Sequence, residues 1–365
     1  MQGRFAAVGG AFAVAGVCTV MLGPLLPRLQ AQLHLHDKDA GLLFAAQFLA
    51  SVAVSSFAGP LAARFGYLRL IAAGMLLCAA GTVALLSTPW PLPVVCAAIN
   101  GCGLGLAIPA GNLSAASCEP GSDARAILFV NLMWCLGAIA APPLVTHAPL
   151  WVTSVACLLC AIPLVRRSAA HGNQPPRIPF RLSRAMALTA ALLFFYVGTE
   201  TSVAGWVASL ASRSTGTRSL WTVLPSVFWA GLLGGRALAP ALLDSLRPAS
   251  LILGGMACAF AGATLLLAQS ASGLTTLAVA ICGLGMAPIY PLVVSEYTTL
   301  EPAGAASGII FSAGGLGGAA IPWAIGAISD ATGNLRGALA TVLVLIVLMS
   351  VLQRNLATTG PGKQT

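Results

Sequence analysis

The stretch RRSAAHGNQPPRIPFRLSR, residues 166–184, is the one long polar connector in a chain that is otherwise strongly apolar. It is rich in Arg and Pro and has no apolar period, which is typical of a linker rather than of a helix or a strand. Long apolar runs lie on both sides of it. The segment therefore divides the chain into an N-terminal and a C-terminal part, and the nature of each part follows from its composition.

The composition indicates that most of the chain lies in lipid. Hydrophobic residues make up 58% of the 365 residues and charged residues only 7%, whereas a soluble domain carries about 25% charged residues. The hydrocarbon core of a bilayer is about 30 Å thick, so a crossing helix needs about 20 apolar residues. The runs are continuously apolar and do not alternate with polar residues, which favours helices over a lipid-facing barrel.

Twelve runs have the length and composition of membrane-spanning helices, six on each side of the linker. They are residues 5–27, 41–62, 70–88, 93–116, 126–147, 150–165, 185–211, 220–243, 248–268, 274–297, 305–329 and 337–355. We therefore expect an all-α membrane protein with a six-helix bundle at 1–165, a linker at 166–184, a second six-helix bundle at 185–356 and a short tail at 357–365. Six spans plus six is the layout of secondary transporters built from two related halves.

The basic residues predict the orientation of the spans. If the N-terminus is cytoplasmic, thirteen of the 18 Arg and Lys residues fall on the cytoplasmic side and five on the outer side, as the positive-inside rule requires. Both termini and the linker are then cytoplasmic, and the net charge of +9 reflects topology rather than nucleic-acid binding. Sixteen Arg against two Lys, together with compact loops, favour a bacterial inner membrane.

The sequence gives no sign of an enzyme or of a metal site. No segment outside the spans is long enough to fold as a catalytic domain, and no G-x-S-x-G, H-E-x-x-H or paired Asp motif is present. Cys157 and Cys160 form a C-x-x-C within one span, where packing is the favoured interpretation over redox chemistry. The histidines fall in loops or at span ends, so we assign no metal and no cofactor.

GPLAARFGYLR, residues 59–69, resembles the loop signature between the second and third spans of the major facilitator superfamily. Gly59, Arg64, Gly66 and Arg69 match that pattern, which is usually Gly-x-x-x-Asp-Arg-x-Gly-Arg-Arg. Ala63 stands where the family usually has Asp, so the charge contact of that Asp is missing. Asp244 lies at the corresponding turn of the second half and is the candidate for an equivalent role there. The resemblance implies two bundles related by pseudo-two-fold symmetry, and a monomer.

Further stretches resemble the branch that includes the fucose and hexose permeases, and the resemblance covers essentially the whole chain. They are GPLLPRL (23–29), IPAGN (108–112), NLMWCLGAIAAPPL (131–144), YVGTETSVAGW (196–206), FWAGLLGGR (228–236), GLGMAPIYPL (283–292) and GGLGGAAIPWAIGAISD (314–330). This branch implies transport of a sugar through a cavity lined by the first, fourth, seventh and tenth spans. One departure is that Thr19 and Asn112 stand where proton-coupled fucose permeases have titratable acids, so that relay does not carry over.

Glu200 is the one acidic residue near the middle of a predicted span. A charge at that depth costs about 2.5–3.5 kcal/mol on insertion scales, so such a residue is a candidate functional site. A carboxyl group that binds and releases a proton there could couple solute movement to a proton gradient. Arg236, in the eighth span, is the candidate partner, and the alternatives are an interhelical hydrogen bond for Glu200 and a cytoplasmic anchor for Arg236.

A sugar site needs polar groups that match hydroxyls, together with flat apolar surface for the ring. The candidates for hydrogen bonding are Gln47, Asn112, Asn131, Glu200 and Tyr290, and those for stacking are Trp134, Trp206, Phe228 and Trp229. For the amides the alternative is interhelical bonding, and for the aromatic residues it is packing. Trp206 and Trp323 also lie where interfacial anchors are expected.

Glycines and prolines predict where the helices pack and bend. The glycines of the G-x-G-x-G at Gly101, Gly103 and Gly105 indicate close helix packing, because no strand precedes them as in a nucleotide loop. The glycines at 314–318, and Pro288 and Pro291, are expected places to bend.

These observations predict a secondary transporter of a small polar solute, in the first place a monosaccharide, working by alternating access with Glu200 as the proton-coupling group. Three alternatives stay open at this point. The chain could be an exporter of lipophilic compounds or drugs, a passive or sodium-coupled sugar carrier, or a membrane receptor or scaffold with a transporter-like fold.

Overall fold

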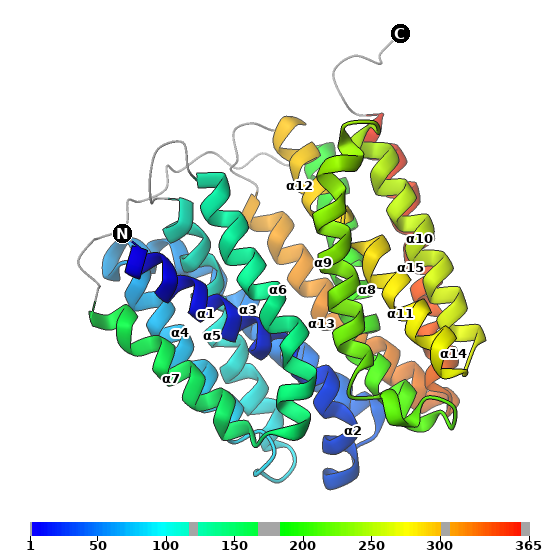
Figure 1. Ribbon diagram of the computed structural model, residues 1–365, viewed down its shortest axis with the longest axis horizontal. Coiled ribbons are helices and arrows are strands. Elements are labelled where there is room, and N and C mark those ends of the chain that lie inside the picture. The colour runs from blue at the N-terminus through cyan, green and yellow to red at the C-terminus, as the bar shows by residue number, and fades with distance from the viewer. Residues whose placement is uncertain (1, 117–122, 167–182, 301–306, 359–365) are drawn as a thin grey trace. The chain divides into compact units, whose positions relative to one another are not determined.

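The computed structural model describes residues 2–116, 123–166, 183–300 and 307–358, and every regular element within these ranges is a helix (Figure 1). Most of the expected linker at 166–184 and of the tail at 357–365 lies outside the described residues. The helices are α1 (Gln2–Val20), α2 (Leu22–Leu33), α3 (Asp37–Phe65), α4 (Tyr67–Val83), α5 (Leu92–Ala116), α6 (Asp123–His147), α7 (Leu150–Arg166), α8 (Arg184–Arg213), the short 3-10 helix η1 (Arg218–Leu220), α9 (Leu224–Leu243), α10 (Pro248–Ala268), α11 (Ser272–Met286), α12 (Ile289–Leu300), α13 (Ser307–Thr332), α14 (Leu335–Leu339) and α15 (Thr341–Ala357).

Twelve apolar spans can be traced in the described part of the chain, in agreement with the sequence. Nine are long enough to cross a membrane by length and composition, a bent pair formed by α1 and α2 gives a tenth, and the shorter apolar helices α4 and α7 complete the set. The chain is thus an integral, multi-pass membrane protein. The predicted boundaries of the spans differ from the observed ones by a few residues, most at the end of the first span, which reaches Leu33 instead of residue 27.

Among the described residues, three spans are interrupted between helices, at α1/α2, α11/α12 and α14/α15, and only the break between α11 and α12 falls where the sequence predicted it. The tenth span is interrupted between α11 and α12 at Ala287 and Pro288, because proline has no N–H for the helical ladder. The first span bends by 42° between α1 and α2, which the sequence did not predict. The glycine run at 314–318 does not interrupt α13, which is continuous from Ser307 to Thr332.

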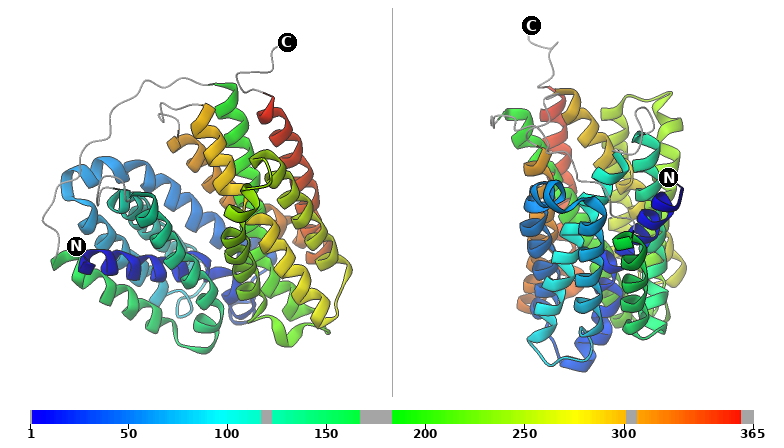
Figure 2. Two further views of the ribbon diagram at one scale, coloured as in Figure 1. Left: turned by 45° about the horizontal axis from the view of Figure 1, so that its top comes forward. Right: turned by 90° about the vertical axis from the view of Figure 1, so that its left-hand side faces the viewer.

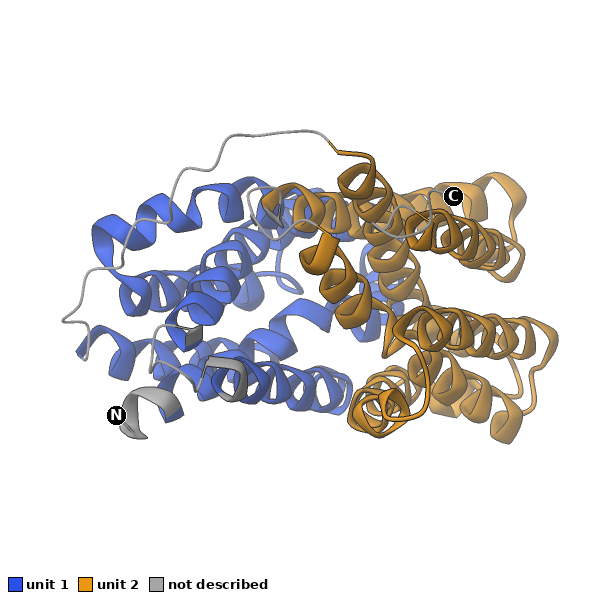
Figure 3. Ribbon diagram, turned by 90° about the horizontal axis from the view of Figure 1, so that it is seen from above, with its two compact units in different colours: residues 1–35, 42–176 blue, residues 36–41, 177–365 orange. Residues whose placement is uncertain are grey.

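The helices form two compact units (Figure 3). Unit 1 comprises residues 1–35 and 42–176, and unit 2 comprises residues 36–41 and 177–365, so the first turn of α3 belongs to unit 2. The same pairings recur in the two units. In unit 1, α1 packs on α6, and α4 packs on α5 and α7; in unit 2, α8 packs on α13, and α10 packs on α11 and α15 (Figure 2). The first span thus pairs with the fifth, and the third with the fourth and sixth, in each unit.

Glycines allow the closest of these crossings in equivalent places. A Cβ atom added to Gly74 of α4 would lie 2.5 Å from the carbonyl oxygen of Gly103 of α5, and the reverse distance is the same. In unit 2, a Cβ on Gly255 of α10 would lie 2.6 Å from the carbonyl oxygen of Gly285 of α11. Only residues without a side chain permit such contact, so the third and fourth spans of each unit meet through a matching glycine pair.

The signature at residues 59–69 forms the end of α3 and the turn into α4. Gly66 has a φ of 86° at this turn, which a residue with a side chain adopts only with strain. Arg64 and Arg69 are exposed, and the guanidinium carbon of Arg64 lies 5.1 Å from the ring centre of Phe65. Gly59 lies within α3, a little more than one helical turn before Arg64. The residue proposed for the matching turn of the second half, Asp244, is exposed directly after α9.

Candidate functional site

Glu200 lies near the middle of α8, which runs without a break from Arg184 to Arg213. Ser183 caps the start of this helix by accepting a hydrogen bond from the backbone N–H of Met186 at 3.0 Å. Tyr196 is one helical turn before Glu200, so its side chain lies on the same face. The hydroxyl of Tyr196 donates to Oε1 of Glu200 at 2.8 Å.

Two more polar residues surround this carboxyl group. The positive charge of Arg236 of α9 interacts electrostatically with Glu200 and with the tyrosine hydroxyls of the site. Tyr290 of α12 lies close enough to interact with the opposite charges of Glu200 and Arg236, and its ring centre lies 5.8 Å from that of Tyr196 and 6.4 Å from that of Phe311. We name Tyr196, Glu200, Arg236 and Tyr290 the Glu200 cluster; it combines a carboxyl, a guanidinium and two phenols against aromatic surface.

Sequence reasoning found three members of the Glu200 cluster and missed Tyr196. The signal was present, since residues four apart on a helix are neighbours. The hydroxyl of Tyr196 also lies 3.1 Å from the carbonyl oxygen of Met286, the last residue of α11, and the side chain is only 1% exposed. The contact with Met286 joins segments 90 residues apart, so no local pattern could predict it.

A second polar group lies in unit 1. The amide of Asn131 of α6 donates to the side-chain oxygen of Asn112 of α5 at 3.2 Å. Each amide nitrogen also donates to a carbonyl of its own helix, one turn earlier. The indole of Trp134 donates to the hydroxyl of Thr19 of α1 at 3.3 Å. Asn112, Asn131 and Trp134 are partly buried, and the structure brings all three to the α5 and α6 side of unit 1.

Gln47 of α3 is held in a buried network and is only 2% exposed. Its amide nitrogen donates to the backbone carbonyl of Cys18 at 2.9 Å and to the side-chain oxygen of Asn100, also at 2.9 Å. Asn100 in turn donates to the hydroxyl of Thr82 at 3.2 Å. The network joins four spans of unit 1, and such amide bonds hold membrane helices together.

The aromatic candidates of unit 2 are packed inside it. Trp206 is fully buried, and its indole donates to the carbonyl of Pro322 at 3.1 Å, which joins α8 to α13. Phe228 is fully buried and Trp229 is 6% exposed, with their rings edge to face at 5.2 Å. This environment favours a packing role for the three residues over stacking on a solute. Trp323, the other candidate anchor, is exposed.

An ionic cluster that the sequence did not predict lies at the first turn of α3. Both carboxylate oxygens of Asp37 accept hydrogen bonds from the guanidinium of Arg213, and Oδ2 also accepts one from Ser329 at 2.5 Å. The carboxylate of Asp330 accepts from the backbone N–H groups of Asp37 and Lys38 at 2.8 and 2.9 Å. Asp330 therefore caps the start of α3, and we name these five residues the Asp37 cluster.

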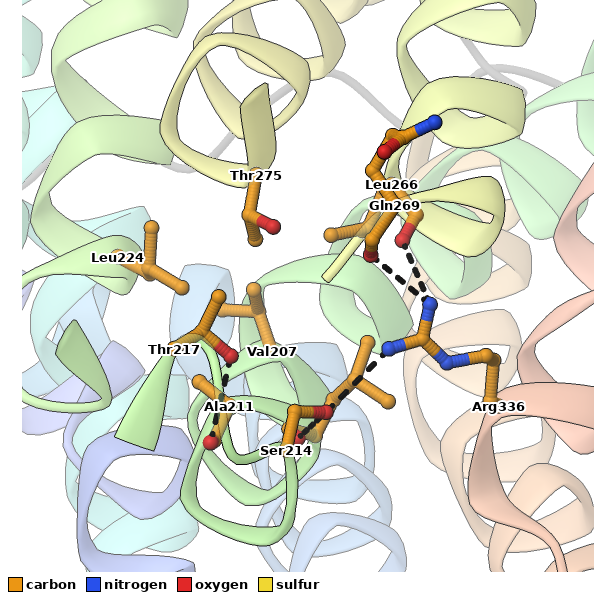
Figure 4. A pocket seen from close by; sticks show the side chains of 10 residues that line it. Val207, Ala211, Ser214, Thr217, Leu224, Leu266, Gln269, Thr275 and Arg336 are labelled. Carbon is orange, nitrogen blue, oxygen red and sulfur yellow. Dashed lines mark hydrogen bonds between the residues drawn. The ribbon is translucent and has the colours of Figure 1, made fainter. Parts of the chain in front are cut away.

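The pocket in Figure 4 lies elsewhere in unit 2 and is not suited to a solute. It has no room for a water molecule, and its polar lining residues, among apolar side chains, are Ser214, Thr217, Gln269, Thr275 and Arg336. The guanidinium of Arg336 donates to the carbonyls of Leu267 and Gln269 at 2.8 and 2.9 Å, so it caps the end of α10. The arrangement is structural.

The family follows from the sequence as a whole. The sequence profile described as Major Facilitator Superfamily matches residues 8–322, which is most of the chain. The chain belongs to the Major Facilitator Superfamily. It is a family of transporters, and the chain is not an enzyme. An uncharacterized MFS-type transporter of Yersinia pestis is 24% identical over 361 residues, which cover 94% of this chain and 93% of the relative.

Solved structures of superfamily members share the fold. A bacterial homolog of the human lysosomal transporter Spinster matches with a TM-score of 0.79 and 13% identity, over 98% of this chain and 97% of the other. A peptide transporter in complex with alafosfalin matches with a TM-score of 0.72 and 15% identity, over 97% of this chain and 94% of the other. The transporter FucP matches with a TM-score of 0.67 and 20% identity, over 97% of this chain and 98% of the other. At these identities the likeness establishes the twelve-helix fold alone.

Proposed function

We propose that the chain is a secondary transporter that moves a monosaccharide by alternating access, with a proton bound and released at Glu200. The observation that carries the proposal is the Glu200 cluster itself. A carboxyl group in the middle of a membrane span is costly unless it has partners, and here it accepts a hydrogen bond from Tyr196 and interacts with the charge of Arg236. Such a carboxyl group can exchange a proton while its partners stay in place.

The chemistry of the cluster suits a neutral, hydroxyl-rich solute. Phenols and a carboxyl group can donate to and accept from sugar hydroxyls, and the ring of Tyr290, stacked beside Phe311, offers a flat apolar surface. In unit 1, Asn112, Asn131 and Trp134 are the candidate residues for the solute, and they stay predictions. FucP, a fucose:proton symporter of Escherichia coli, shares the fold. We propose the same class of solute here, with both termini cytoplasmic in a bacterial inner membrane and a monomer as the working unit.

The test is the uptake of labelled hexoses into proteoliposomes, with and without an inward proton gradient. One pH unit stores about 1.4 kcal/mol per proton, so a coupling of one proton per sugar gives about tenfold accumulation. We expect Glu200→Gln to equilibrate the sugar without accumulating it. Glu296→Gln is the matched control: Glu296 is a partly buried glutamate of unit 2 whose carboxylate accepts a hydrogen bond from Gln353 at 2.7 Å, away from the cluster.

The alternatives make different predictions in the same assay. A passive or sodium-coupled carrier gives hexose uptake that ignores the proton gradient in every variant. An exporter of lipophilic compounds gives no hexose uptake, and hexoses fail to displace its ligand. Either result would contradict the proposal.

A further inference from the structure

We propose that Tyr196 is a positioning residue that transmits the protonation state of Glu200 to the break between α11 and α12. The inference rests on the proposed function for its role in transport, but its geometry stands in unit 2 alone. A phenol carries a single hydroxyl proton, yet the oxygen of Tyr196 lies within hydrogen-bond distance of two acceptors, Oε1 of Glu200 at 2.8 Å and the carbonyl oxygen of Met286 at 3.1 Å. The hydroxyl can donate to only one of them at a time.

The charge on Glu200 decides which acceptor receives the proton of the phenol. A hydrogen bond to an ionised carboxylate is about twice as strong as one between neutral groups, so Tyr196 donates to Glu200 when the carboxyl group is ionised. When a proton from water binds Glu200, the new O–H donates to the phenol oxygen, and the phenol turns its own proton toward Met286. No bond of Tyr196 breaks; the sole covalent change is the new O–H bond on Glu200.

The acceptor lies at the one place where the tenth span is interrupted. Met286 ends α11, and Pro288 follows without an N–H to continue the ladder. The N–H of Ala287 is shared between the carbonyls of Gly283 and Leu284, at 3.1 and 3.4 Å, instead of making one regular bond. A stronger bond from Tyr196 to Met286 on protonation therefore ties α8 to the break between α11 and α12.

The other charged and titratable groups that face Glu200 come from α9 and α12. They are Arg236 and Tyr290, which interact with Glu200 electrostatically. Tyr196 is the residue whose hydroxyl lies within hydrogen-bond distance of both Glu200 and the carbonyl of Met286, so it is placed to pass the change on.

The test is infrared spectroscopy of the full-length protein in lipid, labelled with methionine that carries ¹³C in the backbone carbonyl. The band of Met286 is assigned from its loss in Met286→Leu, a substitution of similar volume. As the pH is lowered through the titration of Glu200, we expect this band to shift to lower wavenumber in the wild type. In Tyr196→Phe and in Glu200→Gln the pH-dependent shift is lost, and in Tyr67→Phe, a tyrosine change beside the core of unit 1, it is retained.

Two results overturn the inference: a Met286 band that does not respond to pH in the wild type, or a response that persists in Tyr196→Phe. If Tyr196→Phe does not fold, the wild type compared with Glu200→Gln decides. The experiment needs no solute, so it can succeed where hexose uptake fails. Conversely, if gradient-driven uptake depends on Glu200 but the Met286 band does not shift with pH, the proposed function is supported and this inference is wrong.

Discussion

Replacing Asp37 by Ala should destabilise the protein substantially, because the carboxylate organises the Asp37 cluster. It accepts two hydrogen bonds from Arg213 and one from Ser329. Hydrogen bonds to charged groups contribute about 1.5–3 kcal/mol each. The Arg213 side chain is 44% exposed, so water replaces much of its interaction and the pair contributes at most about 1 kcal/mol. Ser329 is 2% exposed, so its hydrogen bond contributes nearly its full value to the free energy of unfolding.

The expected loss is therefore about 2–4 kcal/mol of unfolding free energy, with Ser329 contributing the larger share. For a unit of this size, at about 2–4 °C per kcal/mol, that corresponds to a fall in Tm of about 4–16 °C. The assay is thermal unfolding in detergent, repeated at high salt, which screens the Arg213 pair but not the buried bond from Ser329. Asp39→Ala, in the same turn of α3, is the control. If the Asp37→Ala and Asp39→Ala proteins have the same Tm, the reasoning is refuted.

Two further predictions concern helix packing and capping. A Cβ on Gly317 would lie 1.8 Å from the carbonyl oxygen of Phe194, whereas a Cβ on Gly254 meets nothing within 4 Å. Gly317→Ala should therefore lower stability by about 1–3 kcal/mol, and Gly254→Ala should leave it unchanged or raise it by up to about 1 kcal/mol; equal melting temperatures would contradict this. Arg336→Ala should lower the free energy of unfolding by about 1–3 kcal/mol, because carbonyls at the end of α10, such as that of Leu267, lose their donor. The measurement is hydrogen exchange, which should become faster near residues 266–270.

The sequence predicted the spans well because a lipid-exposed helix must satisfy its own backbone, and length and hydropathy therefore define it. It also singled out Glu200, because a carboxyl group at that depth stands out against apolar neighbours. The Asp37 cluster could not be predicted in this way. Asp37, Arg213 and Asp330 fall at span ends, where charges are ordinary, and their pairing joins positions 176 and 293 residues apart.

Gln47 illustrates a second limit of sequence reasoning. An amide in a membrane span needs a partner, but the sequence does not distinguish a solute from another helix as that partner. The structure gives Gln47 two protein acceptors on its nitrogen, so the solute site depends on the remaining candidates. The glycine run at 314–318 shows the same ambiguity: glycines permit either a bend or close packing, and Gly317 packs against the backbone of α8.

The most direct test of proton coupling at Glu200 is to follow protons driven by sugar. Proteoliposomes containing a pH-sensitive dye are given an inward hexose gradient with no initial pH difference. The account predicts that the interior acidifies with the wild type and with Glu296→Gln, and that it stays at its starting pH with Glu200→Gln while the hexose still enters. Acidification by Glu200→Gln at the wild-type rate, or hexose entry without proton movement in the wild type, would contradict it.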